Sequence, residues 1–162
     1  MELLPIFLDI RNQPCLVVGG GTVASRKVAS LRRAGAEIHL VSQELTPELQ
    51  TQVDSGDLIH HARNFKDKDL RGKRLIIAAT NDRKTNQQVA RMAKANGIPV
   101  NVVDQPEACS FLLPSVIDRS PVVVAVSTTK ASPVLARLLR TRLESMIPAG
   151  YGRLADLCAR YR

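Results

Sequence analysis

Short apolar runs alternate with amphipathic stretches through the first two-thirds of the chain. The apolar runs are strand-sized and rich in Val, Ile and Leu, and they cover residues 15–18, 37–41, 58–62, 74–79 and 100–103. Stretches with helical periodicity lie between them, at residues 23–34, 48–54 and 84–96. Because strands that alternate with helices at this spacing form parallel sheets, the pattern predicts a doubly wound α/β fold. We expect a ligand at the carboxyl ends of the strands.

The pattern changes after Asp104. Residues 110–117 and 121–127 predict a β-hairpin with a polar turn at Asp118-Arg119-Ser120, and Ser132-Pro133 predicts the start of an amphipathic helix. Helical spacing then continues to the last residue, as in a chain that is the beginning of a longer protein. We therefore predict three parts: a dinucleotide-binding domain at 1–109, a dimerisation hairpin and helix at 110–147, and the start of a truncated helical region at 148–162. The apolar surface of the hairpin and helix predicts a homodimer.

A glycine-rich turn follows the first predicted strand, with the sequence Gly19-Gly20-Gly21-Thr22-Val23-Ala24. In a Gly-x-Gly-x-x-Ala turn between a strand and a helix, the first glycine permits the tight turn and the second lets the backbone approach a pyrophosphate. The first N–H groups of the helix then bind the anion. This motif predicts an NAD-binding Rossmann sheet with Gly19, Gly21, Thr22 and Val23 at the cofactor. The alternative is a glycine-rich turn that binds no ligand.

Two further segments follow strands at the same predicted edge of the sheet. Thr80 and Asn81 come after the fourth strand, and Gln43 and Glu44 come after the second, where an acidic residue commonly binds the ribose hydroxyls. Glu44 has a second interpretation, as an acidic residue close to the positive end of the helix that Pro47 begins. No Arg follows the second strand to bind a 2′-phosphate, which favours NAD over NADP.

Composition and charge exclude several classes of protein. No apolar run is long enough to cross a membrane, and the N-terminus lacks the pattern of a signal peptide, so we expect a cytoplasmic protein. The three cysteines indicate neither a disulfide framework nor a structural zinc site. The formal net charge is +8, but the few aromatic residues are scattered and no nucleic-acid-binding motif accompanies the charge. Two explanations of the positive charge remain: a basic wall that binds an anionic small molecule, or a solvated helix face.

Six motifs together resemble the precorrin-2 dehydrogenase and sirohydrochlorin ferrochelatase module, the N-terminal part of bacterial siroheme synthase. The resemblance spans essentially the whole chain. It rests on the glycine turn followed by Arg26-Lys27 and on five further motifs: Leu4-Pro5-Ile6-Phe7, Ala78-Ala79-Thr80-Asn81-Asp82, Asn101-Val102-Val103-Asp104, Ser110-Phe111-Leu112-Leu113-Pro114-Ser115 and Ser132-Pro133-Val134-Leu135-Ala136-Arg137. It implies NAD-dependent oxidation of precorrin-2 to sirohydrochlorin and then insertion of Fe²⁺ to give siroheme. In bacterial siroheme synthase this module is followed by a uroporphyrinogen methyltransferase, to which the chain is expected to be fused in a longer protein, although the module also occurs alone.

The resemblance implies that Asp104 is the shared catalytic base, with no fixed metal site and iron bound only transiently near this carboxylate. The alternative for Asp104 is an Asx-turn residue before Pro106. Arg119 and Arg137 are candidates to bind the carboxylates of the tetrapyrrole, because a guanidinium fork matches a carboxylate. Thr128 is a third candidate to contact the substrate, and it keeps a hydroxyl where the family has a serine that can be phosphorylated.

A rival hypothesis from another class is a non-catalytic regulatory module that senses NAD. It requires the glycine turn and the hairpin, but it does not require Asp104.

Overall fold

The computed structural model describes residues 1–129 and 131–161, and these form two compact units. The larger unit is Leu4–Phe111, and the smaller one combines Met1–Leu3 with the chain from Leu112 onward. The helices in these described ranges include none that is long and apolar enough to cross a membrane.

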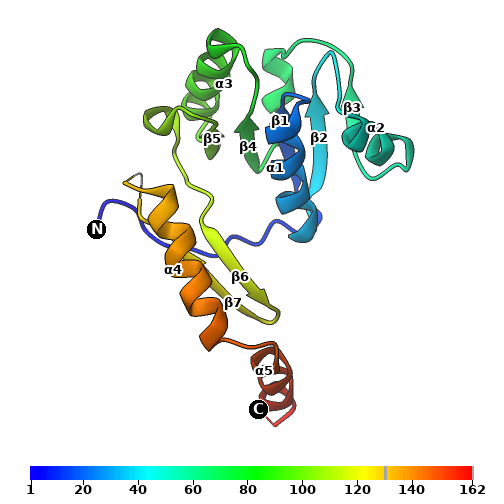
Figure 1. The fold of residues 1–162 in the computed structure, drawn as a ribbon. Helices are drawn as coiled ribbons and strands as arrows, with labels where there is room; N and C mark the ends of the chain where they lie inside the picture. The colour runs from blue at the N-terminus through cyan, green and yellow to red at the C-terminus, as the bar shows by residue number, and fades with distance from the viewer. Residues whose placement is uncertain (130, 162) are drawn as a thin grey trace. The chain divides into compact units, whose positions relative to one another are not determined.

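The larger unit is built on a five-stranded parallel sheet, shown in Figure 1. Its strand order is β3-β2-β1-β4-β5, with the strands β1 (Pro14–Val18), β2 (Glu37–Val41), β3 (Ile59–His61), β4 (Leu75–Ala78) and β5 (Val100–Val102). The order reverses between β1 and β4, which is where a doubly wound sheet opens a crevice. The predicted parallel α/β fold is confirmed.

Helices cover both faces of this sheet. They are α1 (Thr22–Arg33), α2 (Pro47–Asp54) and α3 (Arg83–Ala95), with short 3₁₀ helices η1 (Asp67–Leu70) and η2 (Pro106–Ala108) that the periodicity did not predict. Alternate residues of β1 point to opposite faces. Cys15 and Val17 pack with the buried side of α1, whereas Leu16 and Val18 pack with the buried side of α3. All four are at most 2% exposed, so β1 lies at the centre of the core.

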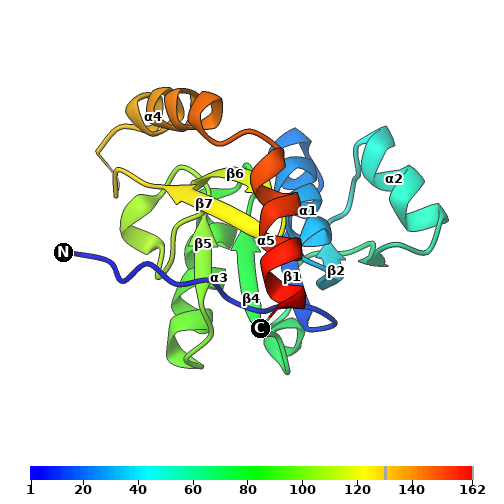
Figure 2. The same ribbon diagram turned by 90° about the horizontal axis from the view of Figure 1, so that it is seen from below.

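The smaller unit contains an antiparallel hairpin and two helices (Figure 2). Its elements are β6 (Ser115–Arg119), β7 (Val122–Val126), α4 (Pro133–Met146) and α5 (Gly150–Arg160). Ser132 accepts a hydrogen bond from Leu135 N–H at 3.2 Å, so α4 begins where the sequence predicted. Its core is thin: Ile117 of β6, Ala136 of α4 and Gly152 of α5 are buried.

The predicted hairpin turn was wrong by about two residues. Asp118 and Arg119 are in β6, paired with Val123 and Val122, and the turn lies at Ser120-Pro121. Alternate positions of β6 are exposed, so this strand accepts the polar residues that suggested a turn. Residues 110–114 are not in a strand either. Ser110 instead accepts a hydrogen bond at its hydroxyl from Val100 N–H, at 2.8 Å, at the start of β5.

Candidate functional site

Three consecutive glycines connect β1 to α1, and two of them are required by packing. Gly19 has a positive φ of 123°, and a Cβ there would lie 2.3 Å from the carbonyl oxygen of Ala79 after β4. A Cβ on Gly20 would lie 1.9 Å from the carbonyl oxygen of Glu44 after β2. Gly21 has nothing within 4 Å of such a Cβ, so its free surface faces open space. The motif analysis assigned no reason to Gly20, because a packing contact with a distant loop leaves no local signal.

The N-terminus of α1 is a free anion-binding end. Gly21 is its N-cap, and no side chain in the described chain caps it, nor does its first turn contain an acidic residue. The N–H groups of Thr22 and Val23 therefore lack the intrahelical partners that later residues have. Ala24 is fully buried, which lets the helix start close to the sheet. The N–H groups and the helix dipole favour a phosphate group here.

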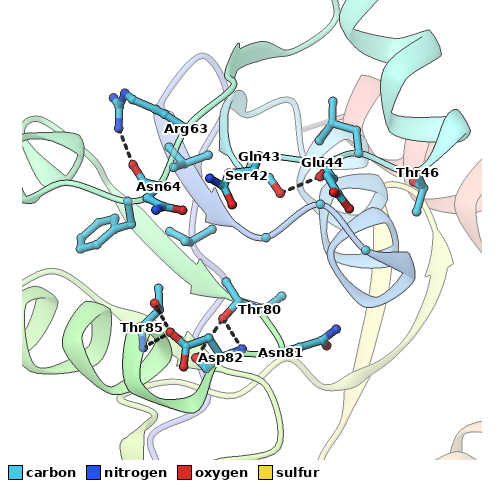
Figure 3. A pocket seen from close by; sticks show the side chains of 18 of the residues that line it. Ser42, Gln43, Glu44, Thr46, Arg63, Asn64, Thr80, Asn81, Asp82 and Thr85 are labelled. Carbon is cyan, nitrogen blue, oxygen red and sulfur yellow. Dashed lines mark hydrogen bonds between the residues drawn. The ribbon is translucent and has the colours of Figure 1, made fainter.

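A pocket of about 870 Å³ opens beside this glycine turn. Figure 3 shows side chains that line it, from the segments after β1, β2, β3 and β4. Six of the eight predicted cofactor residues line this pocket: Gly19, Gly21, Gln43, Glu44, Thr80 and Asn81. Thr22 and Val23 begin α1 directly after the turn and are not among the lining residues. The predicted segments thus meet at the carboxyl edge of the sheet.

The segment after β4 is held by Asn86 of α3. Thr80 Oγ1 donates to Asn86 Oδ1 at 2.7 Å, and Asn86 Nδ2 donates back to the Thr80 carbonyl oxygen at 2.9 Å. Asn86 is only 3% exposed, so this pair fixes the backbone on which Asn81 reaches the pocket. Asp82 follows as the N-cap of α3 and also lines the pocket.

Glu44 lies in the segment after β2 and lines the pocket. Its carbonyl oxygen accepts a hydrogen bond from Ser42 Oγ at 2.6 Å, and its side chain is among those drawn at the pocket in Figure 3. The acidic residue in the first turn of α2 is Glu48, which accepts a hydrogen bond from Ser25 Oγ of α1 at 2.6 Å. Glu44 thus lies two residues before the N-cap of α2 and also at the pocket, so both of its predicted roles stay open.

Arg63, after β3, is a pocket residue that the sequence analysis missed. Its guanidinium donates two hydrogen bonds to Asp69, at 2.8 and 2.6 Å, and the aspartate is 9% exposed. The two residues are only six positions apart, but nothing in the local pattern indicated that the loop folds back on itself. Both carboxylate oxygens of Asp69 thus fix the guanidinium of Arg63 at the wall of the pocket.

Asp104 follows β5 in a turn and is exposed. Its φ is 58°, in the left-handed region that Asp and Asn tolerate better than most residues. It does not line the pocket. Cys109 lies beneath this turn: its Sγ accepts from Val102 N–H at 3.1 Å and contacts the carbonyl oxygen of Gln105 at 3.5 Å. The thiol therefore anchors both sides of the Asp104 turn.

The three predicted substrate residues lie in the smaller unit. Arg119 donates from Nε to the carbonyl oxygen of Ile147 at 3.1 Å and lies 3.5 Å from Glu144, so it joins β6 to the end of α4. Thr128 Oγ1 donates to the carbonyl oxygen of Ser132 at 2.8 Å in the turn before α4. Arg137 is exposed on α4. Their role toward a substrate stays a prediction.

The fold and the pocket define a dinucleotide-binding Rossmann domain. A family model described as "Putative NAD(P)-binding" matches residues 6–115, and the chain belongs to this family. No group of three or more His, Cys, Asp or Glu side chains suited to a metal ion occurs in the described part of the chain.

The relatives are more specific than this family. The chain is 55% identical over 162 residues to a siroheme synthase of Nitrosococcus oceani and 54% identical to that of Methylobacillus flagellatus. It aligns over its full length but spans only 35% of the length of these relatives. Among solved structures, the precorrin-2 dehydrogenase SirC matches with a TM-score of 0.81 at 27% identity, covering 95% of this chain and 76% of that one.

Proposed function

We propose that this chain oxidises precorrin-2 to sirohydrochlorin with NAD⁺. The observation that carries the proposal is the pocket at the free N-terminus of α1, in a chain that aligns from end to end with siroheme synthases. The likeness to a precorrin-2 dehydrogenase supports the same substrate. In the reaction, precorrin-2 loses a hydride and a proton to give sirohydrochlorin, NADH and H⁺.

Residues at the carboxyl edge of the sheet provide the cofactor contacts. The N–H groups of Thr22 and Val23 bind the pyrophosphate next to Gly21, and Gln43 and Glu44 bind the adenosine ribose. Thr80 and Asn81 position the cofactor from β4. NAD⁺ supplies the hydride acceptor when it is bound.

NAD is favoured over NADP by the carboxylate of Glu44 at the pocket and by the pairing of Arg63 with Asp69. Glu44 would repel a 2′-phosphate on the ribose, and Arg63 is already paired with Asp69. A phosphate beside Glu44 would therefore meet a negative charge, whereas the charge of Arg63 is already offset by Asp69.

Asp104 acts as the base of the dehydrogenation. A proton must leave the substrate as the hydride departs, and a carboxylate held on a rigid turn is suited to accept it. The same group then serves iron insertion, in which Fe²⁺ as substrate replaces two pyrrolic protons of sirohydrochlorin to give siroheme and 2 H⁺. The smaller unit contributes Arg119, Thr128 and Arg137 to the tetrapyrrole, and two chains form a homodimer. In a longer protein the module is fused to a uroporphyrinogen methyltransferase.

The proposal is tested by mixing the purified chain with enzymatically made precorrin-2 and NAD⁺ under anaerobic conditions. We expect NADH absorbance and the sirohydrochlorin spectrum to rise in a 1:1 ratio, and NADP⁺ to support a much lower rate. Later addition of Fe²⁺ tests the chelatase step separately. NAD binding without turnover would instead favour the regulatory module that senses NAD.

A further inference from the structure

One wall of the pocket makes none of the proposed cofactor contacts. It is the segment after β3, which lines the pocket with Arg63, Asn64 and Phe65. β3 is the neighbour of β2 on the side away from β1. Since adjacent strands lie about 5 Å apart, this segment is about 10 Å along the sheet edge from the glycine turn. A dinucleotide with its pyrophosphate at the glycine turn and its adenosine ribose after β2 therefore brings its adenine base to this wall.

The segment after β3 is fixed by a buried ion pair. Arg63 Nη1 donates to the carbonyl oxygen of Asn64 at 3.0 Å, and the same guanidinium donates to both carboxylate oxygens of Asp69. Asp69 also accepts a hydrogen bond from Lys66 N–H at 2.8 Å. The backbone of residues 63–66 is thus held at both ends, so the side chain of Asn64 stands on a rigid support.

The side chain of Asn64 is a free amide at the pocket. In Figure 3 it lies across the pocket from Asp82 and Thr85, whose side chains are hydrogen-bonded to each other at 2.5 Å. Within residues 1–129 and 131–161, the Asn64 amide has no hydrogen-bond partner. Phe65, the next residue, is half-buried and packs against the core while it also lines the pocket. An apolar surface beside a free amide suits a planar base.

We propose that Asn64 binds the adenine base of NAD and determines the preference for adenine. A carboxamide pairs with adenine through two hydrogen bonds, because its oxygen accepts from the N6 amino group and its NH₂ group donates to N7. Hypoxanthine has an oxygen in place of that amino group, so it offers the same amide two acceptors and one bond is lost. This inference rests on the proposed position of the ribose at Gln43 and Glu44.

The test compares the calorimetric binding of NAD with that of nicotinamide hypoxanthine dinucleotide. We expect the wild type to bind the hypoxanthine dinucleotide roughly 5- to 30-fold more weakly, in the lower part of the range for an amide–adenine pair because Asn64 is exposed. Asn64→Ala should bind both dinucleotides equally and NAD more weakly than the wild type does. Asn64→Asp keeps the shape of the side chain but cannot donate to N7, so it should also bind NAD more weakly.

Two control variants remove other amides of α3. Gln88→Ala removes an amide that lines the pocket, and Asn96→Ala removes an exposed amide at the end of the helix that does not. Both should keep the wild-type preference for adenine. The two Asn64 variants should melt near the wild type, because Arg63 bonds to the backbone of residue 64 and not to its side chain.

Each outcome decides a specific point. Equal binding of the two dinucleotides by the wild type overturns the inference, as does a preference that survives in Asn64→Ala or is lost in Gln88→Ala. The titrations contain no tetrapyrrole, so a chain that fails to oxidise precorrin-2 can still show the adenine preference. A wild type that does not bind NAD overturns the proposed function, and the inference with it.

Discussion

A substitution at Gly21 tests the cofactor site separately from the fold. A side chain at this position has open space around its Cβ and an ordinary negative φ of −85°. We therefore expect Gly21→Asp to fold but to lose NAD binding, because its carboxylate would take the place of the pyrophosphate and repel it. Calorimetric titration with NAD and a thermal unfolding curve check the two halves of this prediction.

The adjacent Gly20 is the control for that variant. A Cβ there would meet the backbone of Glu44 at 1.9 Å, so Gly20→Ala should unfold at a clearly lower temperature. A folded Gly21→Asp chain with wild-type NAD affinity would contradict the assignment of the glycine turn.

Asp104 has a conformation that lets chemistry and shape be tested apart. At a φ of 58°, Asn is tolerated about as well as Asp, and either residue can form an Asx-turn before Pro106. Asp104→Asn should therefore keep the fold and NAD affinity but lose the base, lowering dehydrogenation and iron insertion by about 10²- to 10⁴-fold each. Separate assays of NADH formation and iron insertion measure the two rates. If both stay near wild type, Asp104 only shapes the turn.

At the scale of elements, α3 depends on the carboxylate of Asp82. Asp82 accepts hydrogen bonds from the side chain of Thr85 and from Lys84 N–H and Thr85 N–H, and these bonds lower its pKa below the ordinary aspartate value. Because the pKa is lower in the folded chain, the stabilisation is present above about pH 4 and is lost as the pH falls through the folded value. Asp82→Ala should therefore melt below the wild type at neutral pH, with the difference shrinking in acid. Melting curves of both proteins from pH 7 to pH 2.5 measure this.

Asp156 provides the comparison for this prediction. It is an exposed aspartate within α5, away from any helix N-terminus. Asp156→Ala should give a melting temperature that follows the wild type across the same pH range. An equal acid dependence in both variants would show that the cap of α3 is not its source.

Elements with a local signal were predicted from the sequence within one or two residues. Buried β1 is flanked by its glycine turn, and α2 begins with Thr46 as N-cap and Pro47 in its first turn, as expected. The hairpin turn was misplaced because a half-exposed strand tolerates Asp118 and Arg119. The helices η1 and η2 were missed, since three or four residues carry no periodicity.

Residues of the candidate site were likewise predictable from the sequence only where a local signal marked them. Residues directly after strands, such as Glu44 and Thr80, were predicted from their position because parallel strands end at one edge. Arg63 and Asn86 were not, because their importance comes from contacts across loops and helices. The domain division and the cytoplasmic location stay predictions.

At the scale of the whole molecule, the smaller unit has few buried residues and many exposed apolar side chains. The exposed residues follow one stripe of α4: Val134, Leu135, Leu138, Leu139 and Met146. Such a surface is typical of an interface, and a second copy of the chain is the occupant that symmetry favours. We expect a homodimer in sedimentation velocity.

Leu138→Asp tests whether α4 forms that interface. An unpaired carboxylate buried there should cost about 3–5 kcal/mol and weaken the dimer more than about 100-fold, giving monomers at micromolar concentration. Gln87→Asp, an equivalent change on the exposed side of α3, should leave the dimer intact. NAD affinity should be the same in both variants, because the pocket lies wholly within the larger unit. A wild type that sediments as a monomer at every concentration, or a dimeric Leu138→Asp, would show that this stripe has another purpose.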